Sequence, residues 1–420
     1  MERKTGTFSN ENRENADLVH YYYEIVRNWN KINYIFKRKL KPSKKLIIID
    51  NYDVAKYYIA IYRIIWEKEK VLKVNEQFKF NSAAISLLKK LESFSWQKTL
   101  ANKYGTERLS LQLAIPSFMI NKLVDVMNFD TIRSNINHMD IQGVGTQFYF
   151  RINELVLNNT KKNSSDLIVK ELKKQGITFT KDKHYPLLYR AALKDKKALL
   201  LSNFFKENKL VIHDKASYTV AHLLDPQAND LILDMCAAPG IKTSIIAQLS
   251  YNKSKIIAND FNKSRFRSMN LFIRRLNVSN THLINSDGIK LPNRYNNFFD
   301  KILLDAPCTG SGTFSTSPEL KWRQNEGFLY QNVTLQEKLL TNAINLLKPT
   351  GILVYCTCSL YPEEGEYQIL KILDSCKPME LPKWFSPSYK INHEHIPGTG
   401  RLFPAIHRTK GFFIAKFKKN

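Results

Sequence analysis

The sequence lacks the features of a membrane or secreted protein. Its 420 residues contain no apolar run near the roughly 18–20 residues that span a bilayer. The first residues, Met1–Thr5, are polar and do not open an apolar signal core. Cysteine is scarce, and five sparsely spaced residues, an odd number, do not form a disulfide framework. We therefore expect a cytoplasmic chain with reduced thiols and no membrane contact.

Metal-binding and phosphate-binding motifs are missing as well. Cys356 and Cys358 lie one residue apart, but no second Cys/His cluster with zinc spacing accompanies them, so we expect no metal. Neither Gly-x-Gly-x-x-Gly nor a Walker loop occurs, which disfavours a dinucleotide or a nucleoside triphosphate as the ligand.

Acidic residues are few compared with basic ones. The chain has 64 Lys and Arg against 38 Asp and Glu, which gives a formal net charge of +26. Phosphate backbones are the usual partners of such a surface. The alternative is a lysine-rich genome that places Lys on every surface, so charge alone favours nucleic-acid binding only moderately.

Three segments differ in pattern. Residues 1–105 read as an all-helical domain, with apolar residues three to four apart in Val54–Trp66. Its basic stretch Lys37–Lys45 is predicted to be a loop, either an RNA contact or a solvated charge run. Residues 106–202 read as a small α+β module, because Thr146–Asn153 alternates like a strand and helical patterns flank it.

Residues 203–420 alternate between strands and helices, which predicts an α/β fold with a doubly wound, mostly parallel sheet. A clear amphipathic helix is expected over Val333–Leu347. The predicted strands are Leu231–Met235, Lys255–Ala258, His282–Ile284, Lys301–Leu304, Gly351–Tyr355 and Gly411–Phe417.

Two cysteines follow predicted strands directly. Cys308 stands in Asp305-Ala306-Pro307-Cys308 and Cys358 in Thr357-Cys358-Ser359. Ligands of open α/β sheets bind outside the carboxyl ends of the strands. A single such cysteine is best interpreted as a small buried hydrophobe, but two in polar loops indicate covalent chemistry.

A carboxylate follows each of three successive strands. The first strand leads through Asp234 into a loop of small residues and a helix start, Asp260 ends the second strand, and Asp287 follows the third. Singly, each Asp is more simply a turn or cap residue. Together they favour an adenosyl ligand without phosphates, S-adenosylmethionine, because carboxylates at such positions accept hydrogen bonds from ribose hydroxyl and adenine amino groups.

These groups suit methylation of carbon 5 of cytosine. A thiolate that adds to carbon 6 makes carbon 5 nucleophilic toward a methyl donor. Asp305 suits the stabilisation of the adduct at ring nitrogen 3, and the two thiols suit attack and release. Lys242 is a candidate for the positive charge that lowers a thiol pKa. Spacing alone does not say which thiol attacks.

Several segments, in this order, resemble the Sun/RsmB family of RNA (cytosine-5) methyltransferases. They are Asp234–Thr243, Asp305–Gly312, Leu320–Arg323, Tyr355–Glu364, and the closing Arg401–Pro404, His407 and Gly411–Phe413. The resemblance extends over residues 106–420, since Phe150–Asn153 is similar to the family's small domain. It implies a Rossmann-like class I methyltransferase domain, and the helical start is similar in kind to the NusB-like domain of some members.

The resemblance also implies residue roles. Cys358 is expected to be the nucleophile and Cys308 to assist product release, while Lys242 and Asp305 face both cofactor and target base. Residues of the cofactor site are expected to be Cys236, Ala237, Ala238, Pro239, Gly240, Ile241, Lys242, Asp260, Asp287 and Asp305. The family usually has Gly where this chain has Ile241, and a Cβ disfavours positive φ. Cofactor affinity is expected to suffer if the loop needs that angle at this position.

The leading hypothesis is a monomeric, S-adenosylmethionine-dependent enzyme that makes 5-methylcytosine in RNA, in rRNA first and tRNA second, and that is nucleolar in a eukaryote. A non-catalytic RNA-binding assembly factor remains open, favoured by Ile241 and the positive charge. A DNA cytosine methyltransferase with Cys308 as nucleophile is a third interpretation, which the Thr-Cys-Ser loop opposes. Amino-group methylation is disfavoured, because the loop reads Asp-Ala-Pro-Cys.

Overall fold

The computed structural model describes residues 10–40, 51–139, 147–157 and 164–420. They form two compact units, residues 1–125 with 318–325 and residues 126–317 with 326–420, which are described separately below. The predicted division after residues 105 and 202 stays a prediction, because compactness does not test whether a segment folds independently.

The first unit is helical, as the sequence predicts. Its interior contains apolar residues from successive helices, among them Ile32, Ile61, Val74 and Leu88. A π-helical stretch, Ile35–Leu40, continues the first helix, so Lys37–Leu40 is helical and not the loop predicted; residues 41–45 lie outside the described part. The helices are α1 Asn10–Tyr34, α2 Asn51–Ile65, α3 Val71–Phe78, α4 Ser82–Lys89, α5 Trp96–Ala101, α6 Gly105–Leu113, α7 Ser117–Leu123 and α15 Leu320–Arg323.

Helix α15 belongs to this unit although it comes from a distant part of the sequence. The indole nitrogen of Trp322 donates a hydrogen bond to the carbonyl of Val26 at 2.9 Å, and its ring lies 4.6 Å from that of Trp29. The Leu320–Arg323 motif therefore packs on α1, a structural use that explains an aromatic residue at this position.

The second unit begins with a small antiparallel sheet in the order β2-β3-β1-β4. Phe150 is fully buried in its core together with Leu172 and Leu199. Its elements are α8 Phe129–Met139, β1 Gln147–Ile152, α9 Ser164–Lys174, β2 Phe179–Lys181, β3 Leu188–Ala192, α10 Lys196–Leu201, α11 Asn203–Lys206 and β4 Leu210–His213.

The large sheet of this unit has the order β11-β14-β15-β9-β8-β5-β6-β7, with β10 paired to β15. Strands β5 to β9 pair in parallel, whereas β15 pairs antiparallel with β9 and β14. The strands are β5 Leu231–Asp234, β6 Lys255–Asn259, β7 Thr281–Ile284, β8 Phe299–Asp305, β9 Leu347–Thr357, β10 Cys376–Pro378, β11 Ser386–Pro387, β14 Thr399–Leu402 and β15 Phe412–Lys419; a separate pair is β12 Lys390–Ile391 with β13 Glu394–His395. The predicted fold class, a mostly parallel doubly wound sheet after a helical region, is confirmed.

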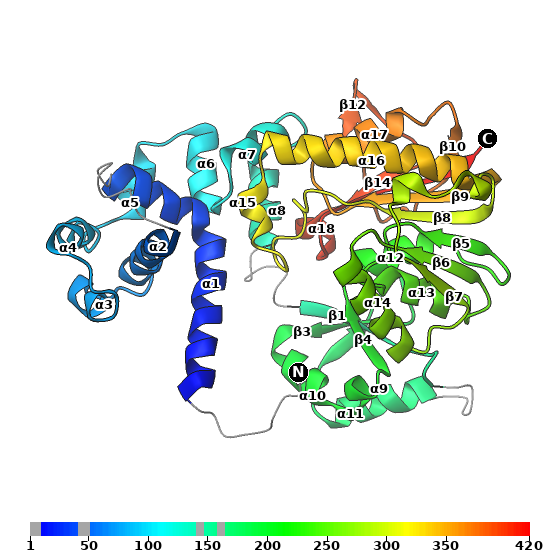
Figure 1. Cartoon of the computed structure of the whole chain (residues 1–420), viewed down its shortest axis with the longest axis horizontal. Coiled ribbons are helices and arrows are strands. Elements are labelled where there is room, and N and C mark those ends of the chain that lie inside the picture. Colours follow the sequence, from blue (N-terminus) through cyan, green and yellow to red (C-terminus); the bar gives the residue numbers. More distant parts are fainter. Residues whose placement is uncertain (1–9, 41–50, 140–146, 158–163) are drawn as a thin grey trace. The chain divides into compact units, whose positions relative to one another are not determined.

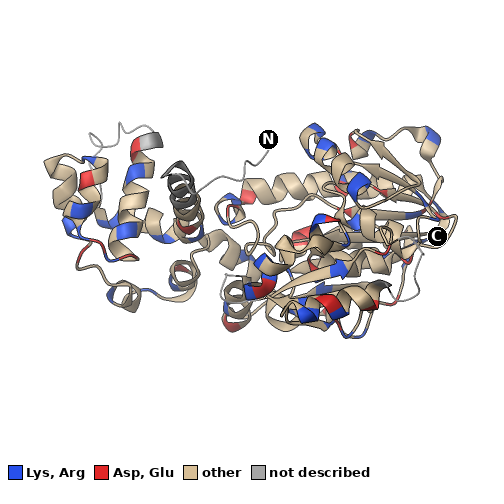
Figure 2. Cartoon of the chain, turned by 90° about the horizontal axis from the view of Figure 1, so that it is seen from below, with Lys and Arg blue, Asp and Glu red and all other residues tan. Residues whose placement is uncertain are grey.

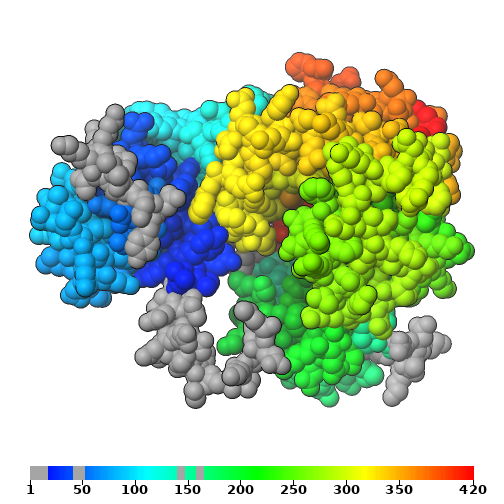
Figure 3. Space-filling view, in the orientation of Figure 1, coloured from blue at the N-terminus to red at the C-terminus, as the bar shows by residue number. Residues whose placement is uncertain are grey.

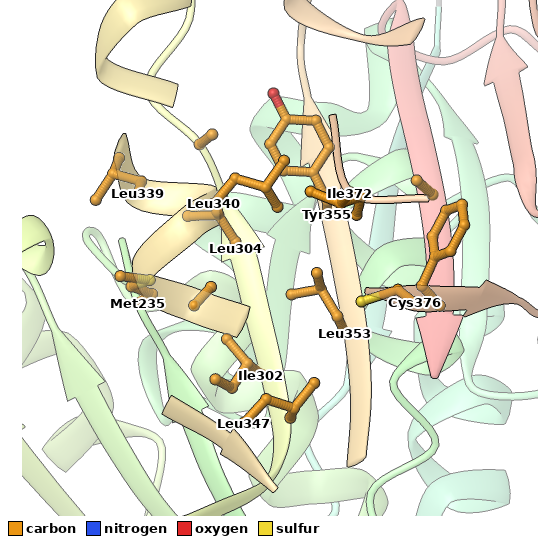
Figure 4. Close-up of a cluster of buried hydrophobic side chains, with 14 of the residues drawn as sticks. Met235, Ile302, Leu304, Leu339, Leu340, Leu347, Leu353, Tyr355, Ile372 and Cys376 are labelled. Atoms are coloured by element: carbon orange, nitrogen blue, oxygen red, sulfur yellow. The ribbon is translucent and has the colours of Figure 1, made fainter. Parts of the chain in front are cut away.

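Helices cover both faces of the large sheet (Figure 1). On one face, Leu339 and Leu340 of α16 Glu326–Leu346 pack on Leu304 and Leu353 of the central strands (Figure 4). The other face is covered by α12 Lys215–Leu223 and α13 Ile241–Leu249, with α14 Lys263–Arg275 beside them; α17 Glu366–Leu370 and α18 Pro404–His407 complete the unit. The space-filling view shows the green and yellow-green segments side by side on one face of this unit (Figure 3).

Arg151 ties the small sheet to the large domain. Its guanidinium is fully buried and donates to the side chains of Gln248 and Ser244 on α13, at 2.9 Å in the latter case. Asn153, two residues on, donates to the carbonyls of Asn208 and Leu276, each at 3.1 Å. The Phe150–Asn153 motif therefore fixes how the small sheet meets the large sheet.

Lys and Arg are spread over the helices and loops of both units rather than gathered in one block (Figure 2). A pattern of this kind agrees with the alternative that much of the positive charge is general decoration. Among the described residues, no helix is both long and apolar enough to span a membrane.

Asp234 is a fully buried carboxylate at the carboxyl end of β5. Its Oδ2 accepts a hydrogen bond from the Thr243 hydroxyl at 2.7 Å, but Oδ1 has no partner in the described part of the chain. Burial raises the pKa of this carboxyl group from 3.8 to about 7. The folded protein therefore holds a proton here that the unfolded chain releases above about pH 4.

We predict that this proton makes stability fall as the pH rises from about 4 to 7, by at most about 1.4 kcal/mol per pH unit. Asp234→Asn stays uncharged, so its free energy of unfolding relative to the native protein should rise over the same interval and level off above pH 7. Urea unfolding at a series of pH values measures this difference.

Asp300→Asn is the matched control, because Lys348 at 2.6 Å and the backbone N–H of Leu231 offset burial and lower the pKa of the Asp300 carboxyl group. The charged Asp300 carboxylate stabilises the fold fully at pH values above the ordinary pKa of an Asp side chain. The Asp300→Asn variant should therefore be less stable than the native protein near neutral pH. A native-like pH dependence of Asp234→Asn would contradict the assignment of a buried proton.

Candidate active site

The loop after β5 turns sharply into α13. Gly240 has a φ of +98°, and a Cβ there would lie 2.9 Å from the side chain of Ile273, so this position requires glycine. Ile241 is the first residue of α13 and is not among the residues of positive φ. The concern that the Ile241 side chain strains the loop therefore does not apply, because Gly240 provides the angle.

Asp260 and Asp287 lie after β6 and β7, at the same edge as this loop. The Asp260 carboxylate is buried and accepts backbone N–H groups of Ala238 at 3.1 Å and Asn262 at 2.9 Å. Asp287 Oδ1 caps the following turn by accepting the N–H of Ile289 at 3.0 Å. Both residues thus act as turn and cap residues, as the simpler interpretation predicts, but these contacts account for only part of their hydrogen bonding.

Hydrogen-bond capacity remains on both carboxylates. Each carboxylate oxygen can accept two hydrogen bonds, and Asp287 Oδ2 accepts none from the described residues. Such a set of acceptors beside the helix start at Ile241 suits the hydroxyl and amino groups of an adenosyl group, so the residues present fit S-adenosylmethionine. The remaining loop residues of the predicted site, Cys236, Ala237, Ala238 and Pro239, line the same turn.

Lys242, Asp305 and Cys356 form one contact group between the loop after β5 and the ends of β8 and β9. Lys242 Nζ donates to Asp305 Oδ2, and the Cys356 thiol lies 3.2 Å from Asp305 Oδ1. Burial opposes the charge on Lys242, but the Asp305 carboxylate outweighs it and raises the pKa of the ammonium group. Burial, followed by Asp305, raises the pKa of the Cys356 thiol, which therefore stays protonated.

The two predicted catalytic sulfur atoms are in contact. Cys308 Sγ and Cys358 Sγ lie 2.9 Å apart, although 50 residues separate them in sequence. The hydrogen bond with Cys358 and then burial raise the pKa of the Cys308 thiol well above its ordinary value. Cys308 therefore holds its proton and can donate it in a hydrogen bond to the sulfur of Cys358.

Glu364 holds the Cys308 loop. Its buried carboxylate accepts the backbone N–H of Thr309 at 2.8 Å and the Gln336 amide at 2.9 Å through Oε1, and the Thr309 hydroxyl through Oε2. The Gln336 amide also donates to the carbonyl of Pro307 at 2.8 Å. Burial raises the pKa of Glu364, opposed by these hydrogen bonds.

Direct bonds also join the two cysteine loops. The hydroxyl groups of Ser311 and Ser359 lie 3.0 Å apart, and the backbone N–H of Gly312 donates to the carbonyl of Cys358 at 3.0 Å. Gly312 has no room for a side chain, because a Cβ would lie 2.3 Å from the carbonyl oxygen of Gly411. These contacts hold the loop of Cys308 close to the loop of Cys358 and to Gly411, the residue before β15.

Arg401 holds the chain after Cys358. It is fully buried in an ion pair with Glu366, with Nε to Oε1 at 2.8 Å, and it donates to the carbonyls of Ser359 and Tyr361. A buried ion pair with satisfied hydrogen bonds is a positioning device. Sequence reasoning placed Arg401 in a motif but assigned it no role, and it missed Glu364 and Glu366 as positioning residues.

Comparison with known proteins agrees with this architecture. Residues 221–418 match the family model of the 16S rRNA methyltransferase RsmB/F. A 28S rRNA (cytosine-C(5))-methyltransferase of Mus musculus is 39% identical over 208 residues, 47% of this chain and 26% of that protein. A tRNA (cytosine(72)-C(5))-methyltransferase of Pyrococcus horikoshii is 39% identical over 203 residues, 48% of this chain and 50% of that protein.

A solved structure extends the comparison. The crystal structure of a methyltransferase homolog from Pyrococcus horikoshii has 31% identity and a TM-score of 0.64, and the match covers 75% of this chain and 99% of that one. The chain spans only a quarter to a half of the two curated relatives. Because the matched residues contain both cysteine loops and the loop after β5, the chain belongs, through residues 221–418, to the RsmB/F methyltransferase family.

Proposed function

We propose that the protein transfers a methyl group from S-adenosylmethionine to carbon 5 of a cytosine in RNA through a covalent cysteine adduct. The observation that carries this proposal is the 2.9 Å contact between Cys308 and Cys358, at the sheet edge where Lys242 and Asp305 also meet. The names of the mouse and Pyrococcus relatives, which specify rRNA and tRNA cytosine-C(5) methylation, support RNA as the substrate.

In this mechanism the Cys358 thiol loses its proton to solvent and its thiolate adds to carbon 6 of the cytosine, while ring nitrogen 3 takes up a proton from solvent. Asp305, held by Lys242, accepts a hydrogen bond from that N–H and so stabilises the adduct. Carbon 5 then carries the electron density that forms the new carbon–carbon bond. Bound S-adenosylmethionine supplies the electrophilic methyl group, and the loop after β5 with Asp260 and Asp287 would hold it.

Release requires that carbon 5 loses its proton, that nitrogen 3 gives up its own, and that the bond between carbon 6 and sulfur breaks. Cys308 is next to the departing sulfur, and its high pKa has two consequences. The thiol can donate its proton to the departing Cys358 sulfur, and the Cys308 thiolate formed in this way is a strong base that takes the proton from carbon 5. Both transfers make Cys308 a release residue, as the family resemblance implies.

The non-catalytic assembly factor is the weaker candidate. The sequence favours it because the Cβ of Ile241 would strain a loop that needs a positive φ at this position. In the structure Gly240 has the positive φ and Ile241 does not, so this argument fails. Its second argument, the net charge of +26, does not discriminate, because an RNA-modifying enzyme needs a basic surface equally.

We predict that Cys308→Ala accumulates a covalent protein–RNA complex, since attack by Cys358 proceeds and release does not. The measurement uses ribosomal RNA from cells that lack the protein, S-adenosylmethionine and a denaturing gel. Cys358→Ala and the double variant should form no complex. Cys376→Ala is the matched control, because this thiol is buried in the core and should leave release unaffected.

A complex that accumulates with Cys358→Ala instead would reverse the two roles. Absence of any complex, together with no transfer of labelled methyl groups from the native protein to ribosomal or transfer RNA, would favour the assembly factor.

We predict further that Glu364→Gln lowers kcat by about 10- to 100-fold and leaves KM for RNA nearly unchanged. With its oxygen toward the Thr309 N–H and its NH2 group toward the Thr309 hydroxyl, the Gln amide keeps these contacts but loses the charge-assisted hydrogen bonds of the carboxylate, at about 1–3 kcal/mol. The more weakly held Cys308 loop should slow catalysis without touching RNA.

Glu337→Gln is the control, because this exposed residue on α16 only pairs with Lys371 at the surface. Steady-state methylation and thermal unfolding should be measured together. A change in KM alone, or an equal effect of both substitutions on kcat, would contradict a positioning role for Glu364.

A further inference from the structure

Apart from the candidate active site, the second unit has a pocket of about 390 Å³ that is lined mainly by basic and aromatic side chains. It lies where the β2–β3 turn meets the first residue of α12, the loop that holds Trp384, and the end of α18. The small sheet and the large domain therefore build it jointly, and none of the proposed catalytic residues lines it.

The pocket has an excess of unneutralised positive charge. The only carboxylate in its lining, Asp182, is occupied by Lys215 at 2.7 Å in an ion pair whose two side chains are each 6% exposed. Four more cations line the pocket, and within the described part of the chain none of them forms an ion pair: Lys181, Lys183, Arg190 and Arg408. Converging cations without acidic partners bind phosphate groups.

A rigid aromatic pair stands beside these cations. The rings of His184 and Trp384 are stacked with centroids 4.4 Å apart and planes 17° apart. Burial and then the nearby Lys215 lower the pKa of His184, so its ring is uncharged near neutral pH. His407 Nδ1 accepts the N–H of Phe403 at 2.8 Å, and Nε2 lies 3.2 Å from the carbonyl of Trp384, which fixes the Trp384 backbone.

The wall of this pocket continues into the candidate active site. One residue after Arg408, the Thr409 hydroxyl donates to Asp214 at 2.7 Å. Gly411 then donates to the carbonyl of Gly312, in the loop of Cys308, at 2.9 Å. The ring of Phe412 lies 5.7 Å from Lys242 Nζ. Four residues of chain thus connect a pocket cation to the catalytic lysine.

We propose that this pocket is a subsite for single-stranded RNA that seats a nucleotide flanking the methylated cytosine, an inference that rests on the proposed function. The four cations hold its phosphates, and the stacked His184–Trp384 pair, with Lys215 Nζ 4.8 Å from the centre of the Trp384 ring, offers a flat aromatic surface to its base. An acidic peptide would use the same cations but not the aromatic pair. Stacking of a base on the aromatic pair therefore distinguishes RNA from an acidic peptide as the ligand.

Direct binding tests the subsite without any methyl transfer. The probe is a fluorescein-labelled, single-stranded RNA of about 20 nucleotides and mixed sequence, titrated with the full-length protein at several salt concentrations. The variant is Arg190→Gln with Arg408→Gln. The matched control, Lys377→Gln with Lys418→Gln, removes two exposed positive charges that face each other across β10 and β15, toward the opposite end of the sheet from Cys358.

We expect the Arg190/Arg408 variant to raise Kd by on the order of tenfold and to reduce the slope of log Kd against log salt by about 1.4, which corresponds to about 0.7 for each of two lost phosphate contacts. The Lys377/Lys418 control should keep the native slope. Trp384→Ala should weaken RNA binding but not binding of a poly-glutamate peptide of matched charge. Lys181→Gln with Lys183→Gln, both exposed, supplies a second test should the first variant unfold.

Equal weakening by the variant and the control, or no weakening by either pocket variant, would overturn the subsite. Unchanged RNA binding by Trp384→Ala would overturn the stacking role. Because the assay needs no cofactor, its failure is distinct from a failure of methylation. A protein that binds as predicted but never methylates RNA would retain the subsite and lose the proposed function.

Discussion

The proposed chemistry depends on keeping two cysteine loops in register at one edge of the sheet. Strands β8 and β9 are neighbours, so both loops leave the sheet side by side. Adjacency alone does not bring two sulfur atoms to 2.9 Å. The Ser311–Ser359 contact, the hydrogen bond from Gly312 to Cys358 and the buried Glu364 supply the remaining constraint. Loss of any of these contacts would move Cys308 away from Cys358, so that attack on the base could proceed while release of the product is impaired.

Much of the fold could be predicted from the sequence because its signals are local. The six predicted strands of residues 203–420 all occur, with ends shifted by a few residues, since short apolar runs bounded by turns define them. The helix expected over Val333–Leu347 is longer and begins at Glu326, because its first turns combine the buried Leu329 with the exposed Tyr330 and so lack a clear apolar stripe. The antiparallel pairing of β15 with β9 could not be predicted, since strand direction leaves no local pattern.

The candidate site was predictable to the same extent. Cys308, Cys358 and Asp305 follow strands, and this position alone predicts that they share an edge. Glu364, Glu366 and Arg401 act through contacts between loops remote in sequence, so no spacing rule finds them. The condition placed on Ile241 is not met, because the positive φ falls on Gly240. Likewise, Arg190 and Arg408 are unremarkable in a chain of 64 basic residues until the fold brings them together.

The central claim is that the sulfur of Cys358 bonds to the cytosine ring. Mass spectrometry tests it most directly, on peptides from the denatured complex of Cys308→Ala with RNA after digestion with nuclease and protease. The account predicts a methylated cytidine nucleotide on the peptide that contains Cys358. Nucleotide mass on Cys236, Cys356 or Cys376, or complexes without any cysteine-linked nucleotide, would contradict it.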